Sequence, residues 1–338
     1  MSRVQINRLA IQPPRLLKNR HVQSMLSSSG LRRLAAQRIA ADLLRDAKEW
    51  ILDGGDGVRL QGFLTLQNAR REPRGLAVLL HGWEGNARSN YVLHTGGRLL
   101  AEGFDVFRLH FRDHGGTQAL NPGLFNSCQL DEVVNAIGDL SRRLPDRELF
   151  LAGYSLGGNF TLRAAVRAPQ LGVNLRHAAA VCPLIDPHNG LAAIESAPWF
   201  YQQYFMLKWT ESLRRKQQLF PDRYRFKASE LRTGVRELTR MLVEQHTEYD
   251  TLEDYLDGYS IAGDRLAAAQ VPMSILTAVD DPIVPVTDFE KLVLPQNARL
   301  DIAPFGGHCG FITDFRMNGF SESWVAERFR EASEAAGR

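Results

Sequence analysis

Short apolar runs alternate with amphipathic segments along most of the chain. The apolar runs have strand length and few polar residues, which predicts strands buried on both faces. They lie at 76–80, 104–110, 148–152, 178–182, 271–278 and 298–303. The segments between and after these runs predict helices at 89–102, 130–144, 159–168 and 321–336. Such alternation is typical of a mostly parallel sheet with right-handed crossovers, so the pattern predicts an α/β fold flanked by helices.

The N-terminal part of the chain departs from this alternation. Residues 49–65 predict a β-hairpin around the glycine-rich turn 53–57. Residues 1–47 predict a basic arm that begins irregularly and becomes helical over 31–45. The apolar stripe of that helix consists of Leu34, Ala35, Ile39 and Leu43. The arm is either a solvated or core-wrapping segment, or a helix that binds a membrane surface or targets the protein to an organelle.

Residues 186–263 interrupt the alternation a second time, with few strand signals and many aromatic and charged residues. Six aromatic residues lie between Trp199 and Trp209, more than one core-facing helical stripe can bury. This composition predicts a helical cap inserted into the α/β core. The aromatic residues either line an acyl pocket or only attach the cap to the sheet. The expected domains are an arm at 1–47, a core at 48–185 and 264–338, and a cap at 186–263.

Composition narrows the classes of partner. The 338 residues carry a net charge of +3, too little to indicate nucleic acid as a partner. The three cysteines are odd in number and not at metal-ligand spacing, which predicts no metal site and a reducing compartment. No apolar run approaches the length of a transmembrane segment, and the first thirty residues lack the apolar core of a secretory signal. We therefore expect a cytoplasmic protein whose partner is a small molecule.

A G-x-S-x-G sequence lies between the predicted strand 148–152 and the predicted helix 159–168. Strand, turn and helix in this order form a nucleophile elbow. So tight a turn holds Ser155 in a strained backbone conformation and leaves room only for small side chains two residues away on each side, a need that Gly153 and Gly157 meet. The motif predicts Ser155 as a nucleophile exposed above the sheet.

A serine hydroxyl needs a base, and the base needs an orienting acid. In this arrangement the residues follow the order serine, acid, histidine. The loop after 271–278 contains Asp280 and Asp281, and the loop after 298–303 contains His308. Both loops lie at the carboxyl edge of the predicted sheet, where ligands bind in open α/β sheets. We expect His308 as the base and Asp281 as the acid, with Asp280 as the alternative.

A tetrahedral intermediate needs two backbone N–H donors. The candidates are Leu156, directly after the nucleophile, and Trp83, in the loop after the early strand 76–80. Cys309 adjoins His308, but we expect its side chain to point away from its neighbour and to lack a setting that lowers a thiol pKa. No nucleotide-binding motif is present, so no cofactor is expected.

These motifs together resemble the α/β-hydrolase superfamily and, within it, the YheT-like branch, also called the AB hydrolase 4 family. The matching stretches are Pro13-Pro14 to Ser24, His81 to Gly85 with Tyr91, Arg112 to Gly116, Gly153 to Asn159, Asp280 to Pro282, and Gly306 to Phe311. The resemblance implies a serine esterase or lipase-like hydrolase, with Ser155, Asp281 and His308 at the triad positions. Family members often carry Leu in place of Trp83 and Asn in place of Asp113. The cap matches the family pattern least.

The sequence therefore predicts a carboxylic ester hydrolase, acylglycerol lipases included, that acts on short- to medium-chain acyl esters through an acyl-enzyme. An acyltransferase using the same acyl-enzyme is the nearest alternative. A ligand-binding protein on a hydrolase fold is a second alternative, although such proteins usually lose a member of the triad.

Overall fold

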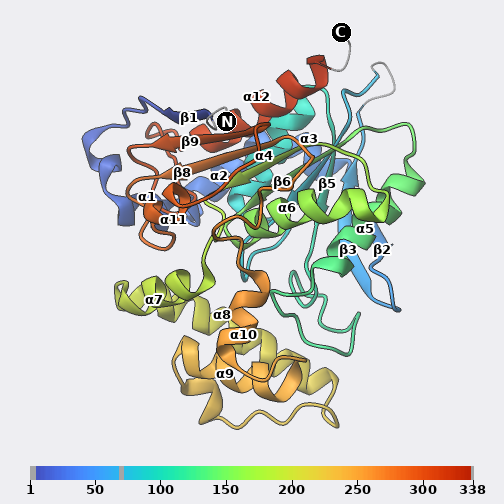
Figure 1. The fold of residues 1–338 in the computed structure, drawn as a ribbon, viewed down its shortest axis with the longest axis vertical. Coiled ribbons are helices and arrows are strands. Elements are labelled where there is room, and N and C mark those ends of the chain that lie inside the picture. The colour runs from blue at the N-terminus through green and yellow to red at the C-terminus, as the bar shows by residue number, and fades with distance from the viewer. Residues whose placement is uncertain (1–4, 68–71, 336–338) are drawn as a thin grey trace.

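A nine-stranded sheet forms the centre of the computed structural model, which describes residues 5–67 and 72–335 (Figure 1). The strand order is β1-β9-β8-β7-β6-β4-β5-β3-β2. The strands are β1 (Gln5–Arg8), β2 (Lys48–Asp53), β3 (Arg59–Thr65), β4 (Leu76–Leu80), β5 (Asp105–Leu109), β6 (Leu149–Tyr154), β7 (Leu175–Val181), β8 (Met273–Ala278) and β9 (Ala298–Ala303). Across the sheet, every pair from β1 through β9, β8, β7, β6 and β4 to β5 is parallel. Strand β3 pairs with β5, and β2 pairs with β3, in antiparallel orientation. The predicted α/β fold class is confirmed.

The central strands are mostly apolar because both of their faces are covered; β5 nevertheless buries Asp105 and Arg108. Every residue of β4, β5, β6 and β8 is buried. One face packs on α5 (Leu130–Arg143) and α6 (Leu156–Arg167). The opposite face packs on helices of the arm, on α4 (Asn90–Ala101) and on α12 (Phe320–Glu334). The molecule therefore has three layers, with α5 and α6 in front of the sheet in Figure 1.

One helix begins earlier than the sequence predicts. Helix α6 begins at Leu156, directly after the elbow serine, rather than at residue 159. Helix α12 is described as far as Glu334, and its expected end at residue 336 lies outside the described residues.

The arm is more ordered than its sequence suggests. It contains β1, the 3-10 turn η1 (Arg15–Lys18) and the helices α1 (Arg20–Ser27), α2 (Gly30–Ile39) and α3 (Ala41–Arg45). The expectation of an irregular start is wrong for residues 5–8, which pair in parallel with β9. Four residues without apolar alternation carry no strand signal of their own, because the hydrogen-bond partner of this strand comes from the far end of the chain.

The predicted apolar stripe of the arm is confirmed at Leu43, which is fully buried, but it is wrong at Leu34 and Ile39. Leu34 is 66% exposed and Ile39 is 42% exposed, whereas Ala36 and Ala40 are fully buried. The buried face of α2 includes Arg32, which forms an ion pair with Glu322 of α12. This ion pair holds the arginine in the interior and leaves Leu34 facing solvent.

Residues 186–263 contain helices and no strand, all of them within the described part of the chain. They form α7 (Pro187–Ser196), α8 (Trp199–Leu219), the 3-10 turn η3 (Glu230–Arg232), α9 (Val235–His246) and α10 (Leu252–Tyr259). These helices lie together beyond one edge of the sheet, in the lower part of Figure 1. They contain a small core of their own that includes Leu213, Tyr224, Leu238 and Leu242. Among the helices described, none is both long and apolar enough to cross a membrane.

Candidate active site

Ser155 occupies the turn between β6 and α6 in a backbone conformation that side chains rarely adopt, with φ of 55° and ψ of −119°. The chain can pass here only because its neighbours are glycines. A Cβ at Gly153 would contact the carbonyl group of Gly157, and a Cβ at Gly157 would lie 2.6 Å from the carbonyl oxygen of Leu80. The Ser155 N–H donates to the Val181 carbonyl at 2.9 Å, which holds the strained turn in place.

His308 bridges Ser155 and Asp281. Its Nε2 lies 2.8 Å from the hydroxyl oxygen of Ser155, and its Nδ1 lies 2.9 Å from Oδ2 of Asp281. Burial alone would lower the pKa of His308, but the Asp281 carboxylate raises this pKa above its ordinary value. The three side chains thus form a continuous hydrogen-bonded chain with the nucleophile candidate at one end.

Asp280 and Asp281 have separate partners. Oδ1 of Asp281 accepts hydrogen bonds from the N–H groups of Ile283 and Val284 at 2.8 and 3.0 Å, which orients the carboxylate toward His308. Asp280 instead accepts from the N–H groups of Gly306 and Gly307, both at 2.9 Å. Asp281 is therefore the residue that contacts the histidine. Asp280 links its own loop, after β8, to the loop after β9.

The loop after β4 passes beside the elbow. A Cβ at Gly82 would lie 3.3 Å from the Cβ of Ser155. The N–H of Gly82 donates to the hydroxyl oxygen of Tyr91 at 2.9 Å, a contact that sequence reasoning did not assign. The N–H groups of Trp83 and Leu156 have no acceptor within the described part of the chain. Both oxyanion-hole candidates thus have a free donor in loops that flank Ser155.

A cavity of about 1090 Å³ opens above Ser155 and His308. Five of the six aromatic residues of α8 line it, namely Phe200, Tyr201, Tyr204, Phe205 and Trp209. Trp199 does not; it is 73% exposed. Trp83 stacks on Phe205 with ring centroids 5.1 Å apart and meets Trp209 edge-on at 5.2 Å. The cavity wall beside the serine is therefore largely aromatic.

Charged groups, Glu84 and Lys208 among them, also line the cavity. Burial raises the pKa of Glu84 to about 7, although the nearby Lys208 ammonium opposes this shift. The backbone N–H of Glu84 donates to Nε2 of His114 at 3.2 Å. The carboxyl group of Glu84 thus titrates near neutral pH within reach of a bound ligand.

Asp113, where family members often carry Asn, has a specific partner in this chain. Its carboxylate lies 2.6 Å from Nζ of Lys216 in α8, and both side chains are buried. The same ammonium donates to the carbonyl oxygens of Gln118 and Asn121 at 3.2 and 2.6 Å. This pair ties α8 to the segment that follows β5.

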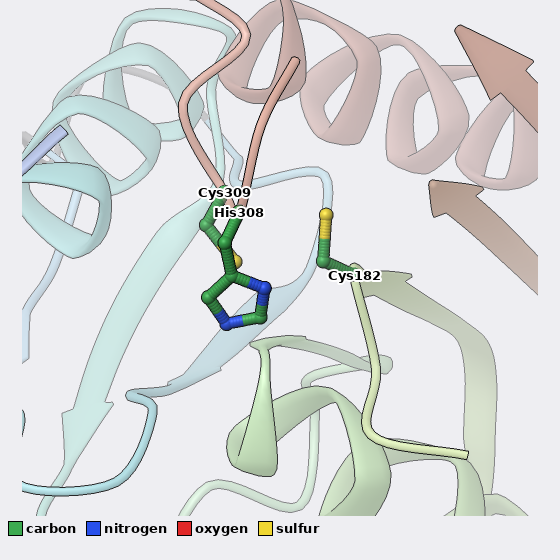
Figure 2. A group of neighbouring side chains, drawn as sticks. All are labelled: Cys182, His308 and Cys309. Carbon is green, nitrogen blue, oxygen red and sulfur yellow. The ribbon is translucent and has the colours of Figure 1, made fainter. Parts of the chain in front are cut away.

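Two cysteines lie beside His308, contrary to expectation (Figure 2). The side chain of Cys309 does not point away from its neighbour: its sulfur, the sulfur of Cys182 and a ring nitrogen of His308 all lie within 4.8 Å of one another. Burial alone would raise the pKa of Cys309, but a hydrogen bond from Cys182 and the adjacent His308 lower it to about 6. Sequence spacing gave no sign of this cluster because Cys182 comes from another strand end.

Comparison with known proteins agrees with this architecture. Residues 71–308 match the family model described as serine aminopeptidase, S33 (Hydrolase_4). A monoacylglycerol lipase of Saccharomyces cerevisiae is 24% identical over 72% of this chain, which spans 56% of that protein's length. YheT of Escherichia coli, a provisionally named esterase, is 26% identical over 94% of this chain and 90% of its own length.

Solved structures show the same fold. The esterase Pf2001 of Pyrococcus furiosus superposes with a TM-score of 0.55 at 16% identity, covering 86% of this chain and 90% of that one. The family match extends over more than half of the chain; it includes the elbow and ends at His308. The chain therefore belongs to the serine aminopeptidase S33 family of α/β hydrolases, and within that superfamily it is YheT-like.

Proposed function

We propose that this protein is a serine carboxylic ester hydrolase with Ser155, His308 and Asp281 as its catalytic triad. The observation that carries the proposal is the hydrogen-bonded chain from Asp281 through His308 to the strained elbow serine, at the base of a large cavity with aromatic side chains in its wall. The family match and the esterase and lipase names of two relatives support ester chemistry.

The geometry suits a two-step reaction through an acyl-enzyme. Oγ of Ser155 attacks the ester carbonyl carbon while Nε2 of His308 takes the hydroxyl proton. Asp281 holds the Nδ1–H of the histidine and stabilises the imidazolium that forms. When the tetrahedral intermediate collapses, the imidazolium passes its proton to the departing alcohol. Water then attacks the acyl-enzyme with His308 again as the base. When this second tetrahedral intermediate collapses, the bond from the acyl carbon to Oγ breaks, the carboxylic acid leaves, and Ser155 takes its proton back from the imidazolium.

The N–H groups of Leu156 and Trp83 are the proposed oxyanion hole. Leu156 is the first residue of α6, so its N–H lies at the positive end of the helix dipole. Trp83 follows Gly82, whose backbone passes close to Ser155. A developing negative charge on the carbonyl oxygen would receive two hydrogen bonds that require no rearrangement during the reaction.

The substrate class follows from the cavity wall. Its aromatic side chains favour an acyl chain of several carbons, because each buried methylene contributes about 0.8 kcal/mol. The proposed substrates are therefore short- to medium-chain acyl esters. In this organisation residues 186–263 act as the cap, residues 48–185 and 264–338 form the catalytic core, and residues 1–47 form the arm.

The test is covalent labelling by a fluorophosphonate probe, together with hydrolysis of p-nitrophenyl esters. Ser155→Ala is expected to abolish labelling and to lower kcat by several orders of magnitude. Ser196→Ala, an exposed serine at the end of α7, is the matched control and should behave as wild type. Persistent labelling or near-wild-type turnover in Ser155→Ala would contradict the proposed nucleophile.

Three further assays separate the alternatives. Hydrolysis of a peptide p-nitroanilide in preference to esters would indicate the peptidase activity named for the family. Preferential transfer of the acyl group to added glycerol would indicate an acyltransferase. Tight ester binding without turnover in the wild type would indicate a binding protein.

A further inference from the structure

The cysteines beside His308 form a cluster of metal-ligand type. Cys182 directly follows β7, and His308 and Cys309 lie in the loop after β9. Figure 2 shows the side chains of His308 and Cys309 extending from the same loop, with Cys182 at the end of β7, which β8 separates from β9. One potential ligand atom from each residue lies within 4.8 Å of the other two. Three donors from two distant segments therefore converge on one point.

The chemistry of these donors selects a borderline-soft cation. Two thiols and one imidazole are the ligand set that Zn²⁺ prefers in proteins. Bond lengths of about 2.3 Å to sulfur and about 2.0–2.1 Å to nitrogen place tetrahedral ligands roughly 3.5–3.8 Å apart. The observed spread of up to 4.8 Å needs only small side-chain movements to reach that geometry. Cys182 and Cys309 are free thiols rather than disulfide partners, as is Cys128, the third cysteine of the chain.

The cluster is buried yet reachable. Cys182 is 0% exposed and Cys309 is 4% exposed, so a bound ion would be largely shielded from water. His308 and Cys309 nevertheless line the cavity above Ser155, whereas Cys182 does not. An ion can therefore enter by the route that the substrate takes.

We propose that Cys182, Cys309 and His308 form an inhibitory Zn²⁺ site that withdraws His308 from catalysis. Both ring nitrogens of His308 are already engaged, one by Asp281 and the other by Ser155. Zinc at either nitrogen must replace one of these hydrogen bonds. Each coordinating thiol releases its proton to solvent, and a water molecule or the Ser155 hydroxyl completes the tetrahedron. The inhibition rests on the proposed function, but the binding of the metal does not.

The first experiment needs no variant. The full-length protein, reduced and freed of metal, is titrated with Co²⁺ as a spectroscopic substitute for Zn²⁺. We expect a thiolate-to-cobalt charge-transfer band and intense tetrahedral d–d bands that saturate at one ion per chain. Addition of Zn²⁺ should bleach these bands. Absence of the charge-transfer band would overturn the proposal.

The second experiment assigns the ligands. Cys182→Ser and Cys309→Ser should each weaken zinc affinity by at least about 100-fold, because losing a direct ligand costs more than losing an outer-shell partner, about 10–100-fold. Cys128→Ser is the control, since Cys128 lies against Tyr255 outside the cluster, and it should keep wild-type affinity. Circular dichroism and thermal unfolding verify that each variant is folded. Wild-type affinity in a folded Cys182→Ser, Cys309→Ser double variant would overturn the assignment.

The third experiment links binding to activity. Stoichiometric Zn²⁺ should inhibit ester hydrolysis by the wild type and by Cys128→Ser, and a chelator should restore it. The ratio of rates with and without zinc should approach one in the cysteine variants. Zinc inhibition that persists there would overturn the inhibitory role. Ser155→Ala should still bind Co²⁺, so a failure of the proposed nucleophile and a failure of the metal site give different results.

Discussion

At the scale of single residues, neighbours with similar side chains have different environments. Asp280 and Asp281 are adjacent, but one accepts from glycine N–H groups and the other contacts His308. Glu84 sits in the cavity wall, where burial raises its pKa to about 7. Each difference comes from the groups that the fold places around the carboxylate, and each leads to a prediction.

Asp281→Asn is expected to lower kcat by roughly 10³- to 10⁴-fold, because a neutral amide neither stabilises the imidazolium nor enforces its tautomer. Asp280→Asn keeps an oxygen that accepts from Gly306 and Gly307, so kcat should change less than about tenfold. Steady-state hydrolysis of a p-nitrophenyl ester by the two purified variants measures this. A larger loss in Asp280→Asn than in Asp281→Asn would reverse the assignment of the acid.

Glu84→Gln is expected to stabilise the protein at alkaline pH. Because the pKa of Glu84 is raised to about 7 in the folded state, from its ordinary 4.5, the native state binds more protons than the unfolded state between these values. Stability must then fall as pH rises from about 4.5 to 7. Removing the titrating group should raise the free energy of unfolding by roughly 1–3 kcal/mol at pH 8 and leave it almost unchanged at pH 4.5.

Thermal unfolding at the two pH values measures this difference. Glu211→Gln is the control, an exposed glutamate of α8 that lines the same cavity. It should show no such pH-dependent gain. Equal stability of Glu84→Gln and wild type at pH 8 would contradict the raised pKa.

At the scale of elements, the partner of a helix decides which of its faces is buried. Helix α2 buries Arg32 because Glu322 of α12 pairs with it, and it exposes Leu34. Helix α8 directs five aromatic residues toward the cavity, but its first residue, Trp199, faces solvent. Hydrophobicity alone does not distinguish Trp199 from Phe205, whereas their positions predict different effects on substrate choice.

Phe205→Ala should reduce the preference for longer acyl chains, because it removes a ring that stacks on Trp83 beside the serine. We expect kcat/KM to rise from acetate to octanoate in the wild type and to rise much less in this variant. Trp199→Ala should retain the wild-type profile, since this residue does not line the cavity. A chain-length series of p-nitrophenyl esters measures both variants. Identical profiles for Phe205→Ala and wild type would mean that the aromatic wall serves packing only.

At the scale of the whole molecule, the arm supports the loop that carries His308. The hydroxyl oxygen of Ser24 accepts from the N–H of His308 at 2.9 Å. The neighbouring Gln23 is fully buried and donates to the carbonyl oxygens of Leu17 and Ile312 at 2.6 and 3.0 Å. Its own side-chain oxygen accepts from the N–H of Ile312 at 2.8 Å. The first and last parts of the chain therefore meet directly behind the candidate active site.

Gln23→Leu should destabilise the protein by at least about 1–3 kcal/mol, because buried backbone groups lose their hydrogen-bond partners. The variant should also lower kcat, since the loop bearing His308 loses its support. Gln12→Leu, which alters an exposed glutamine of the same arm, is the control and should be close to neutral. Chemical unfolding and ester hydrolysis measure the two effects. A Gln23→Leu variant as stable as Gln12→Leu would argue against this role of the arm.

The sequence by itself determined the α/β architecture and the family. Parallel strands that are buried on both faces require apolar runs. Such runs can be recognised at 76–80 and 148–152 from the sequence, before any tertiary contact is known. The elbow is equally local, because only glycines allow the chain to pass as closely as it does at Gly153 and Gly157. The proposed triad residues follow from their order along the chain and from the ends of the predicted strands, and neither requires that a tertiary contact be known.

Only the tertiary structure decided the features that depend on a partner far along the chain. Strand β1 exists because β9 pairs with it, and Arg32 is buried because Glu322 lies opposite. Cys182 and Cys309 meet because β7 and β9, which are parallel and separated only by β8, end at the same edge of the sheet, although the spacing of the two cysteines in sequence resembles no metal motif. The local sequence pattern indicates whether a segment favours a helix or a strand. It does not indicate these contacts, because they depend on which distant segments the fold brings together.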